Sequence, residues 1–234
     1  LIISSSCKSD DRDTSIKTYE KWHTVTLHFE GPETSENAID NPFLNYRLNV
    51  VFTHEQTAYK IRGFYAADGN AAETSADSGN IWQVRFTPDK IGNWTFSATL
   101  SKGDSIALTE EMDKGKMIPI SNSEGKFLVM ASDKKGNDFR ALGGLQASDG
   151  YFKFKESGEY WLKGGADSPE NLLAFEDFDG TYRMSVANRD GEAKTTEQIH
   201  NFEPHLEDWE DGDPTWQNGK GKGLIGALNY LSSK

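Results

Sequence analysis

Acidic residues gather in the hydrophilic stretch from residue 176 to residue 222. Asp177 and Asp179 are separated by one residue and precede a glycine, and Asp208, Asp211 and Asp213 lie further along the chain. Glycoside hydrolysis uses carboxylates in pairs, one as the acid and the other as the nucleophile or base. No such pair can be chosen here by spacing. Calcium also takes carboxylates, but the EF-hand spacing is not met. A calcium site of another type therefore remains an alternative to solvated loop carboxylates.

The same stretch contains histidines and tryptophans. His200 and His205 flank Phe202 and Pro204, and a loop histidine can transfer a proton, bond a hydroxyl group or bind a metal. Two histidines five residues apart in a loop do not predict a metal site, so we expect no metal and no cofactor. Trp209 and Trp216 are large aromatics in polar surroundings. They either stack on sugar C–H groups or form a small core under the loop.

The bulk composition limits the classes of partner. The chain has 234 residues and a formal net charge of -12. An acidic surface repels the phosphate backbone, so nucleic acid is not an expected partner. Neutral sugars need no counter-charge, so a carbohydrate partner is compatible with this composition. The sequence contains no apolar run of 18 residues that could form a transmembrane helix.

The N-terminus has features of an export signal. Leu1–Ile3 are apolar, three serines follow, and Cys7 is the single cysteine, so an internal disulfide is ruled out. This pattern resembles a bacterial lipoprotein signal, with Cys7 as the lipidated residue, although Ser4 stands where an aliphatic residue is usual. We expect residues 1–19 to be a signal remnant and a flexible tether. In that case the membrane is a partner only through the lipid anchor, and the protein is exported to the outer membrane, the cell surface or the periplasm. The alternative is a free thiol in a disordered tail.

Period-two alternation dominates residues 20–123. Apolar residues alternate with polar ones in several short segments that turn residues separate, which is typical of a β-sandwich. A turn at Glu30–Pro32 should end the first segment, and the last strand is expected near Lys116–Ile120. The alternating segments are Val25–Phe29, Tyr46–Phe52, Tyr59–Tyr65, Trp82–Phe86 and Trp94–Leu100.

Residues 124–234 show a different sequence pattern. Tyr151–Phe154 is expected to be a short strand, and Tyr160–Lys163 a buried strand followed by glycines. Ser168 and Pro169 then suit the start of a helix, and a strand followed by a glycine turn and a helix indicates an α/β segment. Gly223–Leu231 is predicted to be an amphipathic helix. Since one strand and one helix cannot close a sheet, we expect the second domain to be incomplete in this sequence.

Several motifs resemble a known module. They are Trp22-His23, Gly31-Pro32, Asn41-Pro42-Phe43 with Tyr46-Arg47, Gly63–Gly69, Trp82, and Phe86–Asp89 with Gly92–Trp94. Together they resemble an immunoglobulin-like domain of unknown function that precedes glycoside hydrolases of the TIM-barrel type. Pro88–Trp94 resembles the corner before strand F of immunoglobulin-like folds, with Trp94 in place of the usual tyrosine. The resemblance implies a mainly β fold, with an immunoglobulin-like β-sandwich at residues 20–123 and an incomplete α/β segment, the start of a TIM barrel, at residues 124–234.

The resemblance also implies where substrate would bind. If Tyr160–Lys163 is the first barrel strand, the loop after it lines the substrate cleft, because the functional face of a TIM barrel is at the C-terminal ends of its strands. Helix capping is the alternative explanation for Ser168 and Glu170. The catalytic carboxylates are expected beyond Lys234. The candidate substrate-binding residues are Lys163, Asp167, Glu170, Asn171, Asp177, Asp179, His200, His205 and Trp209.

Three functional hypotheses follow. The first is the N-terminal portion of an exported bacterial glycoside hydrolase that acts on polysaccharide or oligosaccharide. Its sandwich would brace the catalytic barrel, and this fragment would be inactive alone. The second is a non-catalytic surface lipoprotein that binds glycans or mediates adhesion. The third is a structural cell-surface protein without a ligand. The long acidic and aromatic insert favours the first, because a binding sandwich does not need it.

Overall fold

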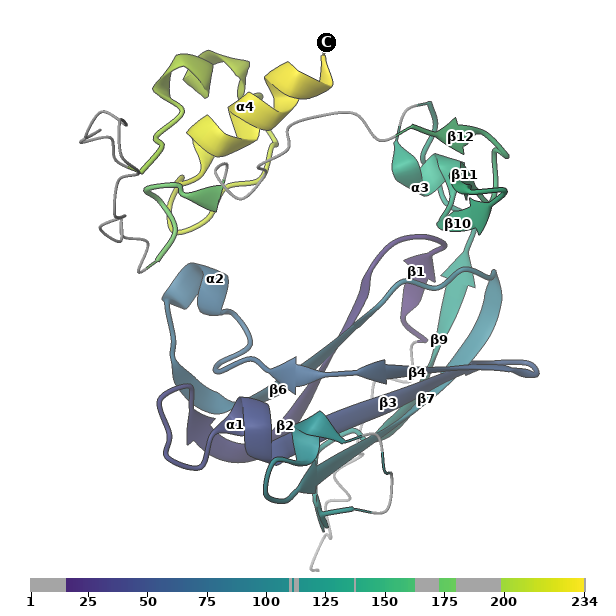
Figure 1. Cartoon of the computed structure of the whole chain (residues 1–234), viewed down its shortest axis with the longest axis vertical. Helices are drawn as coiled ribbons and strands as arrows, with labels where there is room; N and C mark the ends of the chain where they lie inside the picture. The colour runs from purple at the N-terminus through teal and green to yellow at the C-terminus, as the bar shows by residue number, and fades with distance from the viewer. Residues whose placement is uncertain are drawn as a thin grey trace, which may run out of the picture. The chain divides into compact units, whose positions relative to one another are not determined.

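The computed structural model describes residues 16–109, 111, 114–136, 138–162, 173–179 and 199–233. The protein is mainly β, as the sequence predicts, and it forms two compact units (Figure 1). The first unit contains Leu1–Gly69 and Ser78–Leu162. The second contains Asn70–Asp77 and Lys163–Lys234.

The larger sheet of the first unit has six strands of mixed direction. They follow the order β1-β9-β7-β3-β4, and β8 pairs with β7 outside this path. β1 runs parallel to β9, whereas the other pairs are antiparallel. The strands are β1 (Thr18–Glu20), β3 (Tyr46–His54), β4 (Thr57–Arg62), β7 (Gly92–Lys102), β8 (Lys116–Ile118) and β9 (Glu124–Met130).

A second sheet is formed by β2 (Val25–Ser35), β6 (Ser78–Phe86) and β5 (Phe64–Tyr65), all antiparallel. β2 does not stop at the expected turn. It continues past Gly31 and Pro32, and its register with β6 shifts between Glu30 and Thr34. A bulge leaves residues outside the ladder, and a proline without an amide hydrogen is tolerated there.

The expected boundary at residue 123 lies just before a strand of the same sheet. Residues 125–130 were expected to begin a new domain, but β9 pairs with β7 over six positions, from Gly92–Val129 to Ser97–Glu124. Phe127 and Val129 of β9 are buried. The first unit therefore extends to Leu162.

Gly63 is where the chain passes from one sheet to the other. The sequence predicts one strand over Tyr59–Tyr65, but β4 ends at Arg62 and β5 begins at Phe64. The Gly63 amide donates to the carbonyl oxygen of Leu48 at 2.9 Å. A Cβ added to Gly63 would overlap the Leu48 side chain and the backbone oxygen of Gln83. Only glycine fits this crossing.

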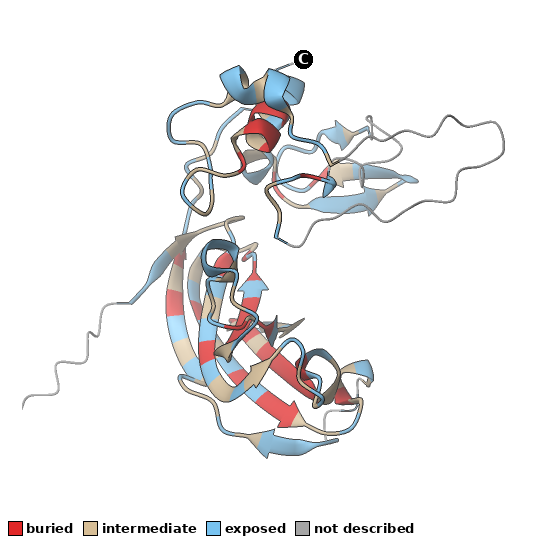
Figure 2. Ribbon diagram, turned by 90° about the vertical axis from the view of Figure 1, so that its left-hand side faces the viewer, coloured by how far each residue is buried: buried red, intermediate tan, exposed pale blue. Residues whose placement is uncertain are grey.

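Aromatic side chains from both sheets form the core between them. The ring of Phe52 on β3 stacks on Phe86 of β6 with centroids 4.2 Å apart, and Trp94 of β7 meets Phe86 edge to face at 5.1 Å. Phe52 and Trp94 are fully buried, and so are Trp82 and Phe127. Buried residues recur along the strands of this unit, as the red segments in Figure 2 show. Trp82 and Trp94, which each begin a predicted alternating segment, therefore belong to this core.

Trp94 also fixes the corner before β7. Its indole Nε1 donates to the carbonyl oxygen of Lys90 at 3.0 Å. His54 reaches the same corner, where its Nε2 lies 2.9 Å from the carbonyl oxygen of Ile91. These bonds hold the Pro88–Trp94 segment between β6 and β7.

A small antiparallel sheet follows β9 in the first unit. It contains β10 (Leu145–Ser148), β11 (Tyr151–Phe154) and β12 (Tyr160–Trp161), preceded by α3 (Phe139–Leu142). β11 confirms the predicted strand. β12 was expected to be buried, but Tyr160 and Leu162 are exposed, and the strand pairs with β11 through two residues. So short a strand on a three-stranded sheet has little surface to bury it.

The second unit has its own aromatic cluster. Phe175 is buried against Phe178, Phe202 and Trp216. The described elements are α2 (Ala71–Thr74), η3 (Glu203–Asp208) and α4 (Lys222–Ser232), and α4 confirms the predicted amphipathic helix. α4 packs on η3 so closely that a Cβ on Gly226 would overlap the carbonyl oxygen of His205. In the described part of the chain, no helix has the length and apolar character needed to span a bilayer.

Replacing Gly63 tests the crossing between the sheets. We expect Gly63→Ala to lower the free energy of unfolding by about 1–3 kcal/mol, because the new methyl group must displace Leu48 or the backbone at Gln83. Gly103→Ala is the matched control, since a Cβ there would meet its nearest neighbour at an ordinary 3.4 Å. Urea denaturation measures both variants. Equal stability of the two variants would contradict this explanation of Gly63.

Candidate functional site

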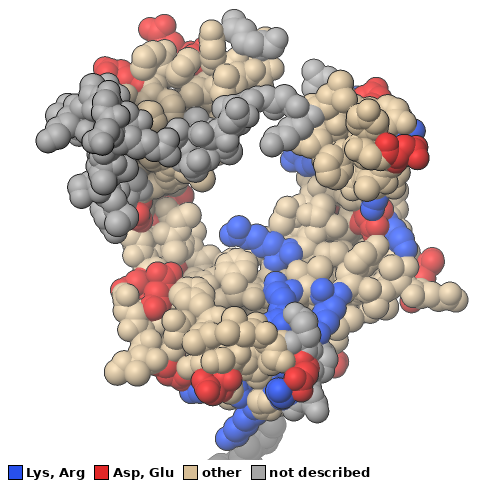
Figure 3. Space-filling model, viewed as in Figure 1, with Lys and Arg blue, Asp and Glu red and all other residues tan. Residues whose placement is uncertain are grey.

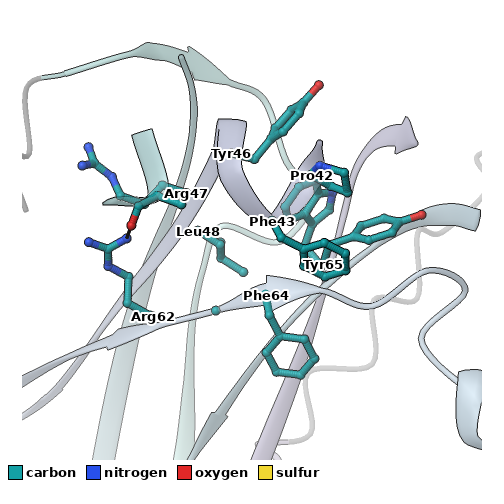
Figure 4. Close-up of a pocket in the computed structure, with 11 residues that line it drawn as sticks. Pro42, Phe43, Tyr46, Arg47, Leu48, Arg62, Phe64 and Tyr65 are labelled. Carbon is teal, nitrogen blue, oxygen red and sulfur yellow. Dashed lines mark hydrogen bonds between the residues drawn. The ribbon is translucent and has the colours of Figure 1, made fainter. Parts of the chain in front are cut away.

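A pocket of about 360 Å³ opens in the first unit where the chain crosses from β4 to β5. Figure 4 shows Phe43 and Tyr65 on one side, Arg47 and Arg62 on the other, and Leu48 between them. The volume lies within the range of small-molecule pockets. The lining residues are Pro42, Phe43, Tyr46, Arg47, Leu48, Arg62, Gly63, Phe64, Tyr65, Trp82 and Ala107.

Aromatic rings form most of the wall. Phe43 is 51% exposed, and Tyr65 and Trp82 are buried. The Phe64 side chain, in contrast, points away from these rings (Figure 4) and lies 5.4 Å from the Arg85 guanidinium. Phe43 meets Tyr65 edge to face at 6.0 Å. The Tyr65 hydroxyl donates to backbone oxygens of Thr34 and Gly79 at 2.6 and 3.0 Å, which fixes the ring. The wall therefore offers an exposed ring on a rigid backing.

A short capped helix presents Phe43. In α1 (Pro42–Asn45), Pro42 stands at the start of the helix, and the Asn41 side chain accepts a hydrogen bond from the Phe43 amide at 2.9 Å. Both features are typical of helix N-termini. Asp40 accepts from Asn45 and from the Tyr46 hydroxyl at 3.0 and 3.1 Å. These bonds fix the loop that carries Phe43.

Two arginines form the opposite wall. Arg47 donates to backbone oxygens of Thr109 and Lys114 at 2.9 and 3.2 Å. Arg62 donates to Thr109 and Ala107 at 2.9 and 3.3 Å. The guanidinium groups therefore anchor the segment around η1 (Ile106–Leu108) to β3 and β4. On the face seen in Figure 3, a group of Lys and Arg side chains lies over the middle of this unit, although the protein as a whole is acidic.

The composition of the pocket limits its chemistry. Among the residues that the structure describes, its lining includes no carboxylate and no histidine, so these residues offer neither the acid nor the nucleophile of glycoside hydrolysis. An exposed ring and a few polar groups suit binding instead. No local pattern in the sequence marks this site, because its residues come from separate segments. The motifs Asn41-Pro42-Phe43 and Gly63-Phe64-Tyr65 stand out only through the resemblance.

Asp177 and Asp179 lie in the second unit and support its fold. Asp177 Oδ2 accepts from the Gly221 amide at 2.7 Å, directly before α4. A carboxylate at this position stabilises the positive end of a helix. Asp179 accepts from Ser75 Oγ and from Gln217 Nε2. Both predicted binding residues are thus engaged in bonds within the unit.

His205 and Trp209 lie at a different place, against α4. His205 Nδ1 is 2.9 Å from Asp208 Oδ2, and its ring lies 4.9 Å from that of Tyr230. The Lys222 ammonium group lies 3.9 Å from the centre of the Trp209 ring. Trp209 is partly buried beside the helix, which agrees with the small-core alternative.

His200 occupies a third position. Its backbone forms a bridge with Phe175, and its ring stacks on Phe202 at 5.2 Å. Lys163, Asp167, Glu170 and Asn171 lie outside the described residues, as does Cys7. The predicted binding residues that the structure describes therefore all make contacts within the second unit, where the amide of Glu176, next to Asp177, donates to the carbonyl oxygen of His200 at 3.0 Å.

The chain resembles known proteins in part of its length. Residues 18–101 match a family described as a domain of unknown function, DUF5060, and the motifs listed above fall within this stretch. No curated protein matches the chain. A crystal structure from Bacteroides vulgatus, of a protein described as a putative glycoside hydrolase, aligns with a TM-score of 0.40 and 20% identity over 67% of this chain. This chain spans 25% of that protein, and a likeness this weak carries no argument about function.

The acid sensitivity of the second unit tests the role of Asp179. Hydrogen bonds from Ser75 and then Gln217 lower the pKa of Asp179 from its usual range. Its contribution to stability is present above its unfolded pKa and lost as the pH falls through the lower folded pKa. We expect Asp179→Asn to lower the melting temperature at neutral pH and to match the parent protein in strong acid. Thermal unfolding across pH measures this, with Asp211→Asn as an exposed control. A constant difference at every pH would contradict the assignment.

Proposed function

We propose that this chain is the N-terminal portion of an exported bacterial glycoside hydrolase that acts on polysaccharide or oligosaccharide. In this proposal Cys7 is the lipid anchor, the first unit is an immunoglobulin-like sandwich that braces the catalytic barrel, and residues from Lys163 onward belong to the start of that barrel. The catalytic carboxylates belong to the part of the protein after Lys234.

One observation supports an accessory role, rather than a catalytic one, for the described residues of the first unit. The described residues that line the pocket of the first unit include no carboxylate, and Asp177 and Asp179 of the second unit are engaged in bonds that stabilise the fold. Glycoside hydrolysis needs two carboxyl groups facing one glycosidic bond. The described lining of this pocket therefore suits binding rather than bond cleavage.

The carbohydrate assignment rests on the sequence. Motifs from Trp22 to Trp94 resemble a module that precedes TIM-barrel glycoside hydrolases, and the match to the domain of unknown function covers the same stretch. The acidic composition is compatible with a carbohydrate partner, because hydroxyl groups and ring faces need no counter-charge.

Exposed apolar side chains favour the bracing role. Phe43 and Phe64 are exposed at the rim of the pocket, and Leu108 of η1 is 79% exposed. α1 packs on η1 and on β5, so these side chains belong to one end of the first unit. Apolar groups that cluster on a surface mark contacts with other protein surfaces. A neighbouring domain of the same protein suits this end of the unit.

Hydrolysis assays on two lengths of the protein test the proposal. The 234-residue chain alone is expected to release no reducing sugar from polysaccharide, because the proposal assigns the catalytic carboxylates to the part of the protein after Lys234. A longer protein that continues past Lys234 is expected to release sugar. Turnover by the 234-residue chain, or inactivity of the longer protein on all polysaccharides tested, would sink the proposal.

Glycan binding without catalysis is the second candidate, and the exposed ring of Phe43 at the pocket favours it. Aromatic faces stack on sugar C–H groups, so this pocket would hold a saccharide. Electrophoresis in polysaccharide gels would then show retardation of the parent chain, and Phe43→Ala would weaken binding about tenfold, which corresponds to a loss of about 1.4 kcal/mol. Phe152→Ala, which is as exposed as Phe43 but lies outside the pocket, is the control. Equal mobility of all three proteins would exclude this pocket as the binding site.

A further inference from the structure

Glu20 and His23 are brought together by a tight turn at the end of β1. The His23 amide donates to the carbonyl oxygen of Glu20 at 3.1 Å, and Trp22 between them has a positive φ of 66°. His23 Nε2 consequently lies 3.2 Å from Glu20 Oε2. These side chains are 23% and 37% exposed, so solvent reaches both.

Asp133 joins this pair from the neighbouring strand. β1 and β9 run in parallel with Glu20 opposite Met130, so both strands end at the same edge of the sheet. The Lys21 amide donates to the Met130 oxygen at 2.9 Å, and the Asp133 amide donates to Glu20 Oε2 at 3.3 Å. The two chain segments therefore leave the sheet side by side. Asp133 lies three residues after Met130.

The three side chains have the geometry of metal ligands. One ligand atom from each of Glu20, His23 and Asp133 lies within 4.8 Å of the others. Two ligands at zinc-bond lengths in a tetrahedral arrangement are about 3.4 Å apart, close to the observed separation of Glu20 and His23. Ser132 Oγ lies 3.4 Å from His23 Nε2, where it could bond a metal-bound water.

We propose that Glu20, His23 and Asp133 form a binding site for a divalent transition-metal ion of the zinc type. One imidazole and two carboxylates suit zinc, whereas calcium and magnesium prefer oxygen ligands alone. Three protein ligands leave a fourth position for water. The ion would join the end of β1 to the segment after β9 and so hold the first strand of the unit in place.

Lys134 is the competing cation. Its ammonium group lies 3.0 Å from Asp133 Oδ1, and it must turn away when an ion binds. Asp133 is 65% exposed, so this ion pair is largely solvated, and solvated pairs of this type contribute little to stability. A dipositive ion held by three ligands replaces that contact.

Zinc titration of the full 234-residue chain tests the site. Because a thiol also binds zinc, the parent protein carries Cys7→Ser, and it is first stripped with a chelator. Calorimetry with zinc chloride is expected to detect a site whose affinity falls more than about tenfold in His23→Ala, since even indirect ligand partners contribute that much. His28→Ala, which removes an exposed histidine of β2, should leave this site unchanged.

Two further measurements distinguish the loss of zinc binding in the variants from a loss of folding. Zinc should raise the melting temperature of the parent but not of His23→Ala, because an ion that binds only the folded state stabilises it. Asp133→Asn changes an exposed side chain and should reproduce the loss of affinity without unfolding the protein. Equal zinc binding by the parent, His23→Ala and Asp133→Asn would overturn the proposal, as would the absence of zinc binding by the parent.

Discussion

The packing of aromatic rings between two sheets is the interaction on which the first unit depends. The chain has one cysteine, so no internal disulfide can join the sheets. Phe52 on Phe86 and Trp94 beside them supply the contact instead. Large buried rings remove much apolar area from water and add specific edge and stacking contacts. The strands that carry the pocket and the Glu20–His23 turn are held by this core.

The crossing at Gly63 links the core to the pocket. Because the chain changes sheets there, Arg62 remains on the larger sheet while Phe64 joins the smaller one. The opening between their side chains lies over Leu48, on which Gly63 packs. The pocket is thus a consequence of how two sheets are joined: Arg47 and Arg62 belong to the larger sheet, and Tyr65 and Trp82 to the smaller one.

The sequence was a good guide to local structure and a poor guide to pairing. Period-two alternation located the strands around Phe52, Trp82 and Trp94, because burial on one face is a local property. It could not show that residues 124–130 pair with β7, since partners distant in sequence leave no local pattern. The sequence also could not distinguish between the roles open to the carboxylates of the acidic loop. A carboxylate that caps a helix, as Asp177 does, looks in sequence like one that binds a ligand.

The edge of the larger sheet explains why an additional link at β1 would matter. β1 has three residues and pairs with β9 on one side only. Its contacts with β9 include the ring of Tyr19, which meets Phe127 edge to face at 5.4 Å, and the Leu128 amide, which donates to the oxygen of the preceding residue Lys17 at 2.9 Å. Short edge strands are where sheets open first, because few buried contacts resist fraying. Any tether that precedes β1 pulls on this strand. An ion bound by Glu20, His23 and Asp133 would transfer that force to the segment after β9, a strand that is paired on both sides.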